Sequence, residues 1–128
     1  TGESCAVAGY TGSFTVTGPW AGNQTVAYNA SLHGDHVILV LDPLDVACTV
    51  ATVMTTTALP TQFRPTATSA ARPVSSIVVN NDANAIGLFQ IALNGVITIS
   101  SDIAGTAFTN GHQCGFPATV LSYSVRLA

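Results

Sequence analysis

Apolar and polar residues alternate along much of this chain, so that every second position is apolar over several stretches. The stretches 11–17 and 25–32 show the pattern most clearly. Successive side chains of a β-strand point to opposite faces of a sheet, so this period of two predicts strands with one buried and one wet face. The apolar positions in these stretches are Phe14, Val16, Val26, Tyr28, Ala30 and Leu32.

The stretch 36–42 has a different pattern, because residues 37–41 read Val-Ile-Leu-Val-Leu with no polar break. A continuous apolar run of this length is typical of a strand that is covered on both faces. We therefore predict that this strand lies centrally in its sheet.

Further runs bring the prediction to about eight strands, at spacings typical of a sandwich or barrel. Abundant Thr and Val disfavour helix. Asn94-Gly95 and Gly34-Asp35 supply the positive φ angles of type I′ hairpin turns. The predicted fold class is therefore all-β, an antiparallel β-sandwich or jelly roll. The further runs are 46–54, 72–80, 85–93, 96–100 and 119–127.

The chain carries unusually few ionised groups, and this excludes some classes of partner. Only 7 % of the residues are charged, against roughly 25 % in an ordinary domain. Lysine is absent, and the three cations are Arg64, Arg72 and Arg126. Three arginines cannot line a groove that tracks phosphates, which argues against nucleic acid as a partner. No apolar run approaches the about 20 residues of a spanning helix, so we expect no membrane insertion.

The low charge also bears on assembly. A folded domain of 128 residues exposes on the order of 6,300 Å², and so few charges leave most of that surface uncharged. Scattered charge normally prevents association, so we predict a homo-oligomer; the alternative is a neutral, Thr-rich monomer. We expect one domain over 1–128, with 1–10 as an N-terminal extension or a shaft remnant, in a mature product or a piece of a longer chain.

Three cysteines allow at most one bridge within the chain. Cys48 lies in an alternating run and reads as a small buried apolar residue. Cys5 and Cys114 lie in Gly-rich segments and could pair with each other or with another chain.

Two short clusters have potential chemistry. His33, Asp35 and His36 could hold a transition metal, but the simpler interpretation is a polar hairpin tip, and we expect neither a metal nor a cofactor. His112 lies two residues before Cys114, yet no third group is indicated that would orient a thiol–imidazole pair. Motifs of hydrolases and phosphate-binding loops are absent. We therefore expect a protein that is not an enzyme.

Several segments together resemble the C-terminal head domain of phage tail fibres and receptor-binding proteins, and related fibre-like proteins of large DNA viruses. The resemblance runs from Gly18 to the end. Leu59-Pro60-Thr61-Gln62-Phe63-Arg64-Pro65 is its most specific part, with Leu59 and Phe63 expected in apolar sites and Arg64 on local carbonyls or an acid. The other segments are Gly18-Pro19-Trp20, 24–32, 34–41, Gly87-Leu88-Phe89-Gln90-Ile91, Asn94-Gly95-Val96-Ile97-Thr98-Ile99, Gly115-Phe116 and Ser122-Tyr123-Ser124-Val125.

This resemblance implies a trimeric head, outside cells or on the virion surface, that binds a host cell-surface saccharide or protein. The alternatives are a structural or decoration subunit of a virion without a receptor site, and, third, a glycan hydrolase at a fibre tip. The family's motifs transfer no binding residue. On the chemistry of polar and aromatic loop positions, the predicted ligand-binding residues are Trp20, Asn81, Asp82 and His112.

Overall fold

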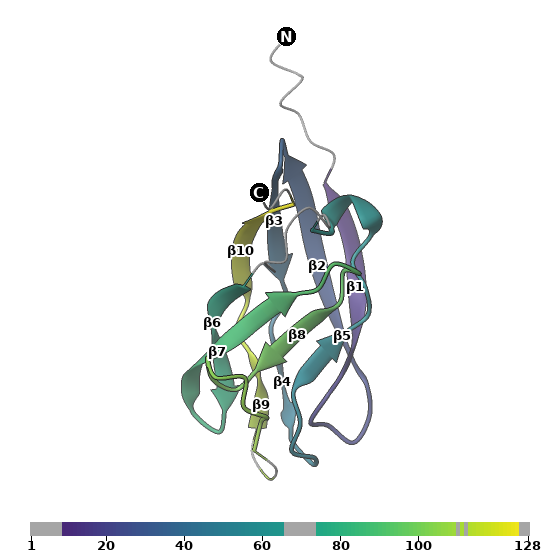
Figure 1. The fold of residues 1–128 in the computed structure, drawn as a ribbon. Helices are drawn as coiled ribbons and strands as arrows, with labels where there is room; N and C mark the ends of the chain where they lie inside the picture. The colour runs from purple at the N-terminus through teal and green to yellow at the C-terminus, as the bar shows by residue number, and fades with distance from the viewer. Residues whose placement is uncertain (1–8, 66–73, 110, 112, 126–128) are drawn as a thin grey trace.

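The computed structural model describes residues 9–65, 74–109, 111 and 113–125, and it is an antiparallel all-β structure (Figure 1). The predicted fold class is confirmed, with ten strands in one curled sheet. Among the described residues, no helix is long and apolar enough to cross a membrane. The elements are β1 Tyr10–Thr17, β2 Gln24–His33, β3 His36–Leu41, β4 Leu44–Ala47, β5 Met54–Thr56, the 3₁₀ turn η2 Thr61–Phe63, β6 Val74–Asn81, β7 Asn84–Ile91, β8 Ile97–Ser100, β9 Gln113–Phe116 and β10 Thr119–Ser124.

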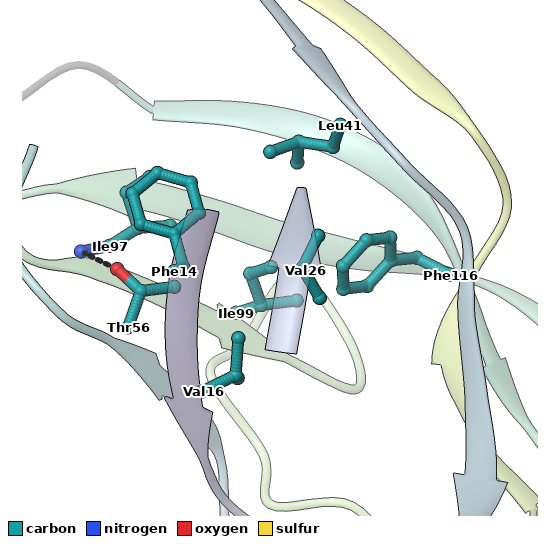
Figure 2. Close-up of a pocket in the computed structure, with 8 residues that line it drawn as sticks. All are labelled: Phe14, Val16, Val26, Leu41, Thr56, Ile97, Ile99 and Phe116. Atoms are coloured by element: carbon teal, nitrogen blue, oxygen red, sulfur yellow. Dashed lines mark hydrogen bonds between the residues drawn. The ribbon is translucent and has the colours of Figure 1, made fainter. Parts of the chain in front are cut away.

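The sheet curls so that its two halves pack face to face. Its strand order is β10-β3-β2-β1-β5-β8-β7-β6-β9-β4. Side chains from β1, β2 and β3 meet side chains from β8 and β9 across the core (Figure 2). A void of about 10 Å³ remains between them, too small and too apolar to hold a ligand. Its lining residues are Phe14, Val16, Val26, Leu41, Thr56, Ile97, Ile99 and Phe116, with the Ile97 N–H donating to Thr56 Oγ1 (3.1 Å).

Two strand pairs form one long ribbon that passes from one half of the sheet to the other. β3 pairs with β10 up to Leu41↔Thr119, and β4 pairs with β9 from Leu44↔Phe116. Pro43 and Pro117 lie in the two short gaps between these strands. Proline donates no ladder hydrogen bond, so a bend at these points is favoured.

This bend opens a groove between β6 and β10. β6 pairs with β9 only at Asn80 and Asn81, while the continuing chain, β10, pairs with β3 instead. We call the resulting depression the seam groove. It is lined by Val74, Ser75, Phe89, Ile91, Leu121, Ser122 and Tyr123.

The most specific segment of the sequence resemblance packs as expected. Leu59 and Phe63 are buried, and Arg64 Nε donates to the Leu59 carbonyl (2.7 Å). The Leu59 N–H donates to the Gly95 carbonyl (2.9 Å). The 59–65 segment and the Asn94-Gly95 turn, two motifs of the sequence resemblance, are therefore hydrogen-bonded to each other.

Two strand predictions were wrong. The stretch 46–54 is not one strand, because β4 ends at Ala47 and β5 begins at Met54; between them, the N–H groups of Thr49 and Val50 donate to the Pro19 carbonyl. The segment 113–116, for which no strand was predicted, is β9. Gly115 is needed there for close approach, since a Cβ would overlap the Leu44 carbonyl.

The prediction for 36–42 was wrong in one respect. The strand β3 does have a neighbour on each side, but its burial alternates and Ile38 is 37 % exposed. Only one face of β3 is covered within a single copy. Packing in the core therefore accounts for Val37, Leu39 and Leu41, but not for the apolar residues Ile38 and Val40 on the outward face.

Neither hairpin turn is of type I′. Gly34 and Gly95 have positive φ angles, of 64° and 86°, but Asp35 and Asn94 do not. In the second turn, Gly95 N–H donates to the Ala92 carbonyl (2.9 Å). Residues 92–95 therefore form a reverse turn, and Gly95 is its last residue, in the left-handed conformation.

Candidate binding site at the loop end

Four connections gather at one end of the molecule, opposite the β2–β3 turn (Figure 1). They join β1 to β2, β4 to β5, β6 to β7 and β8 to β9. We call this region the loop end, and define it as residues 18–23, 48–53 and 81–83 with the described part of 101–113. Three of the predicted ligand-binding residues, Trp20, Asn81 and Asp82, lie here.

A disulfide joins Cys48, in the connection between β4 and β5, to Cys114 of β9. The prediction that Cys48 is a free apolar residue was therefore wrong, although its side chain is buried. Sequence spacing could not reveal the pairing, because 66 positions separate the two residues. Cys5 lies outside the described residues. The bridge also removes Cys114 as a thiol nucleophile, so the pairing with His112 has no chemical basis in this state.

Backbone hydrogen bonds extend the cross-linking across the loop end. Thr49 N–H donates to the Pro19 carbonyl (2.6 Å), and Phe108 N–H donates to that of Thr52 (3.0 Å). Gly111 N–H donates to the Cys48 carbonyl (3.1 Å). These bonds hold the backbones of the irregular connections together.

The turn between β6 and β7 is joined to the neighbouring loop by its own side chains. The Asn81 amide donates to Thr109 Oγ1 (3.3 Å) and accepts from Thr109 N–H (3.0 Å). Asp82 N–H donates to the Gln113 carbonyl (2.9 Å). Asp82 has a φ of 70° and an exposed side chain. Asp is one of the few residues that tolerate this conformation.

Trp20 is 5 % exposed and belongs to the core. Its indole N–H donates to the carbonyl of Cys114 (3.4 Å). The ring therefore positions the disulfide-bonded strand and does not offer a flat face to solvent. His112 lies outside the described residues.

The loop end carries acidic and amide groups. Asp45, at its rim, accepts a hydrogen bond from the Asn80 amide (3.0 Å). Asp102 accepts from the N–H groups of Thr106 and Ala104, and these bonds hold the pKa of its carboxyl below the usual value. Arg64 is the only described cation, and it lies beside Gly95 at the other end. The described loop end is thus negatively charged.

The predicted metal-binding cluster lies at the opposite end. His33 and His36 face each other across the β2–β3 turn, both exposed, and His33 Nε2 lies 3.0 Å from Ser31 Oγ. Within the part of the chain that the structure describes, no three His, Cys, Asp or Glu side chains group to hold a metal. These residues form an exposed polar hairpin tip.

Three exposed polar residues of this region were not predicted from the sequence: Asp45, Thr109 and Gln113. The alternation of Gln113, Cys114, Gly115 and Phe116 was a weak strand signal that would have placed Gln113 beside the turn.

No family model and no curated protein matches the chain. Among solved structures, the chain is similar to the T1L reovirus attachment protein sigma1, solved in complex with alpha-2,3-sialyllactose. The TM-score is 0.59 at 15 % sequence identity, over 92 % of this chain and 65 % of that chain. This chain is therefore similar in fold to the matched part of sigma1, and it spans somewhat less than two thirds of that protein's chain.

Proposed function

We propose that this chain is the receptor-binding head of a viral attachment protein. It is a non-enzymatic domain of the virion surface, and it binds a saccharide on the host cell; the predicted alternative ligand is a host protein. The observation that carries the proposal is the likeness of its fold to sigma1, an attachment protein solved with a bound oligosaccharide. The loop end supplies the surface on which such a ligand binds.

The loop end suits a sugar because it is cross-linked and rich in hydrogen-bonding groups. Saccharide hydroxyls need donors and acceptors at fixed positions. The disulfide and the Asn81–Thr109 hydrogen bonds order this surface before binding, which lowers the entropic cost of association. Asp82 and Gln113 are joined through their backbones, so two exposed polar side chains lie close together.

The charge of this surface favours a neutral saccharide over an anionic one. Asp45, Asp82 and Asp102 surround the described loop end without a described cation. A carboxylate accepts hydrogen bonds from neutral hydroxyls, whereas a sialic acid carboxylate would be repelled and would find no arginine among the described residues of this surface. Asp82 and Gln113 are the proposed contacts with the saccharide, and Asn81 and Trp20 position them. His112 remains a predicted ligand-binding residue.

We further propose that the head is a homotrimer related to the tips of phage tail fibres and of fibres in large DNA viruses. The support is the sequence resemblance described above and the low charge of the chain, 7 % of residues.

Glycan-array binding with matched variants tests this proposal. Asp82→Asn and Gln113→Ala remove groups at the loop end, and Asp35→Asn and Gln62→Ala remove the same groups at exposed positions of the other end. Loss of one hydrogen bond of a charged group costs about 1.5–3 kcal/mol, so we expect Asp82→Asn to weaken binding of a neutral glycan about ten-fold or more. The controls should bind like the parent chain. Retention of sialylated glycans only, or equal loss in all four variants, would contradict the proposal.

A structural or decoration subunit is the second candidate, and the uncharged outer faces of the sheet favour it, because such faces suit assembly. Competition separates the two functions. A receptor-binding head added in solution blocks adsorption of the virus to its host, and a decoration subunit does not.

A further inference from the structure

The outward side of β6, β7 and β8 carries aliphatic residues of β6 and β7 among uncharged hydroxyl and amide side chains. Val74, Val78 and Ile86 are 58 %, 40 % and 54 % exposed, and Val78 and Ile86 are direct cross-strand partners. Ser76 and half-buried Leu88 form the next pair. We call this surface face A.

The outward side of β10 and β3 is a second aliphatic surface, face B. Val120 is 69 % exposed and pairs with half-buried Val40. Ile38, 37 % exposed, pairs with Ser122. This is the outward half of the apolar run in β3 that the core of one copy leaves unexplained.

Neither face carries an ionisable side chain between its ends. On face A the outward residues of β6, β7 and β8 are all aliphatic, hydroxyl or amide residues. On face B only His36 and Asp42, at the two ends of β3, can ionise. Exposed strands of monomers are normally protected from association by charges. A partner for either face must itself be uncharged and apolar, and each face meets that requirement for the other.

The two faces meet along one line. Val74 of face A and Ser122 of face B line the same seam groove. Two different surfaces that join along an edge suit a ring, in which each copy uses one surface for each neighbour and the edge faces the rotation axis. A two-fold dimer would need only one of them.

The strand lengths set the size of the contact. Eight-residue strands extend about 27 Å, and three adjacent strands are about 14 Å wide, so face A covers at most roughly 380 Å² as a flat sheet. Face B has two six-residue strands and covers roughly 200 Å². Each contact is therefore smaller than the about 1,000 Å² of a typical specific interface, and a closed ring strengthens it because every copy makes two such contacts.

We propose that face A of one copy docks on face B of the next, with the seam groove at the axis of a closed ring. This inference deepens the proposed homotrimer by naming its contact surfaces, and it depends on the proposed function only for the number of copies.

Complementation between variants tests it. Ile86→Glu places a charge on face A and Val120→Glu places one on face B; Ile103→Glu is the control, at a 65 % exposed position in the 101–112 loop. Analytical ultracentrifugation should give a mass about one third of the parent value for each face variant, and the parent mass for the control. Mixed in equal amounts, the two face variants should form a one-to-one dimer, because the mixture retains one intact face A and one intact face B.

The outcomes separate cleanly. Circular dichroism verifies that each variant is folded; should Ile86→Glu unfold, Ile86→Thr removes apolar surface and keeps a β-branched residue. A parent chain that is monomeric, face variants that keep the parent mass, or a mixture that stays monomeric would each overturn the inference. Glycan binding by monomeric Ile86→Glu is measured separately, so its loss or retention decides the proposed function independently of assembly.

Discussion

The two ends of this head are stabilised in different ways. The loop end is joined by the Cys48–Cys114 disulfide and by hydrogen bonds between irregular connections. The opposite end has an aromatic cluster instead. Its rings are Tyr10, Phe14, Tyr28 and Phe63, with contacts such as Phe14–Tyr28 at 4.2 Å between centroids and Tyr10–Phe63 at 5.7 Å, and the Tyr123 hydroxyl donates to the Phe63 carbonyl (2.7 Å).

The difference shows where this fold has freedom to vary. At the aromatic end, Phe14, Tyr28 and Phe63 are buried, so these side chains belong to the core. At the loop end, cross-links fix the backbone, so exposed side chains such as Asp82 and Gln113 are not needed for the core. A binding surface can change there at little cost in stability.

Removing the disulfide should have the largest effect on stability. Closing a loop of 66 residues in the unfolded chain contributes about 4 kcal/mol in the chain-entropy model. Cys48→Ala/Cys114→Ala should therefore lower the free energy of unfolding by about that amount, measured by denaturant titration. Reductant should shift the parent chain toward the double variant and leave the variant itself unchanged. A parent chain that is indifferent to reductant would refute the role of this bridge.

Phe63→Ala should have an effect of similar size at the aromatic end. Phe63 is 2 % exposed, and truncation of a buried Phe costs about 3–5 kcal/mol. Its exposed neighbour Gln62 provides the control, since Gln62→Ala should change stability by less than about 0.5 kcal/mol. Hydrogen exchange should show lost protection near β10 and the 59–65 segment first. A Phe63→Ala chain as stable as Gln62→Ala would contradict the aromatic account.

Gly95→Ala compared with Gly34→Ala isolates one contact at the aromatic end. Both glycines have positive φ angles, so each alanine costs about 1 kcal/mol in the backbone. A Cβ at Gly95 would also lie 2.8 Å from Arg64 Nε, whereas one at Gly34 meets nothing within 4 Å. We expect Gly95→Ala to be the more destabilising by about 1 kcal/mol or more. An equal decrease in melting temperature for the two variants would show that the 59–65 segment moves to accommodate the added Cβ without cost.

Alkaline pH should affect the aromatic end through Tyr28. Burial, followed by the neighbouring Tyr10, raises the pKa of Tyr28 from 10.0 to about 12, and burial also raises the pKa of Tyr123. The folded state therefore favours the neutral phenols, so their contribution to stability is constant below pH 10 and falls as the pH rises toward 12. Denaturant unfolding at successive pH values would show this decline. Tyr28→Phe should lessen it, and an unchanged slope would assign the decline to other groups.

Local pattern predicted most of the strands but not the contacts between them. The alternation in 11–17 and 25–32 predicted β1 and β2 closely, because a single buried face determines it. The disulfide and β9 were missed because both depend on partners far away in the sequence, namely Cys48 and β4. The burial of β3 was predicted wrongly for a related reason. The sequence pattern indicates that both faces of the strand are apolar, but it does not indicate whether both faces are covered within the same copy.

The candidate site was predicted only in part. Asp82 was identified from turn composition, but the same reasoning selected Trp20, whose burial depends on long-range packing against Cys114. Thr109 and Gln113 gain their positions from Asn81 and Asp82, and no local pattern encodes those pairings.

The most direct test of the central claim is an isotope-labelled NMR titration with a neutral glycan retained on the array. The account predicts chemical-shift changes at Asp82, Thr109, Gln113 and neighbouring amides of the loop end, with the aromatic end and its His33–His36 turn unchanged. Shifts confined to the aromatic end or to the two aliphatic faces would contradict it.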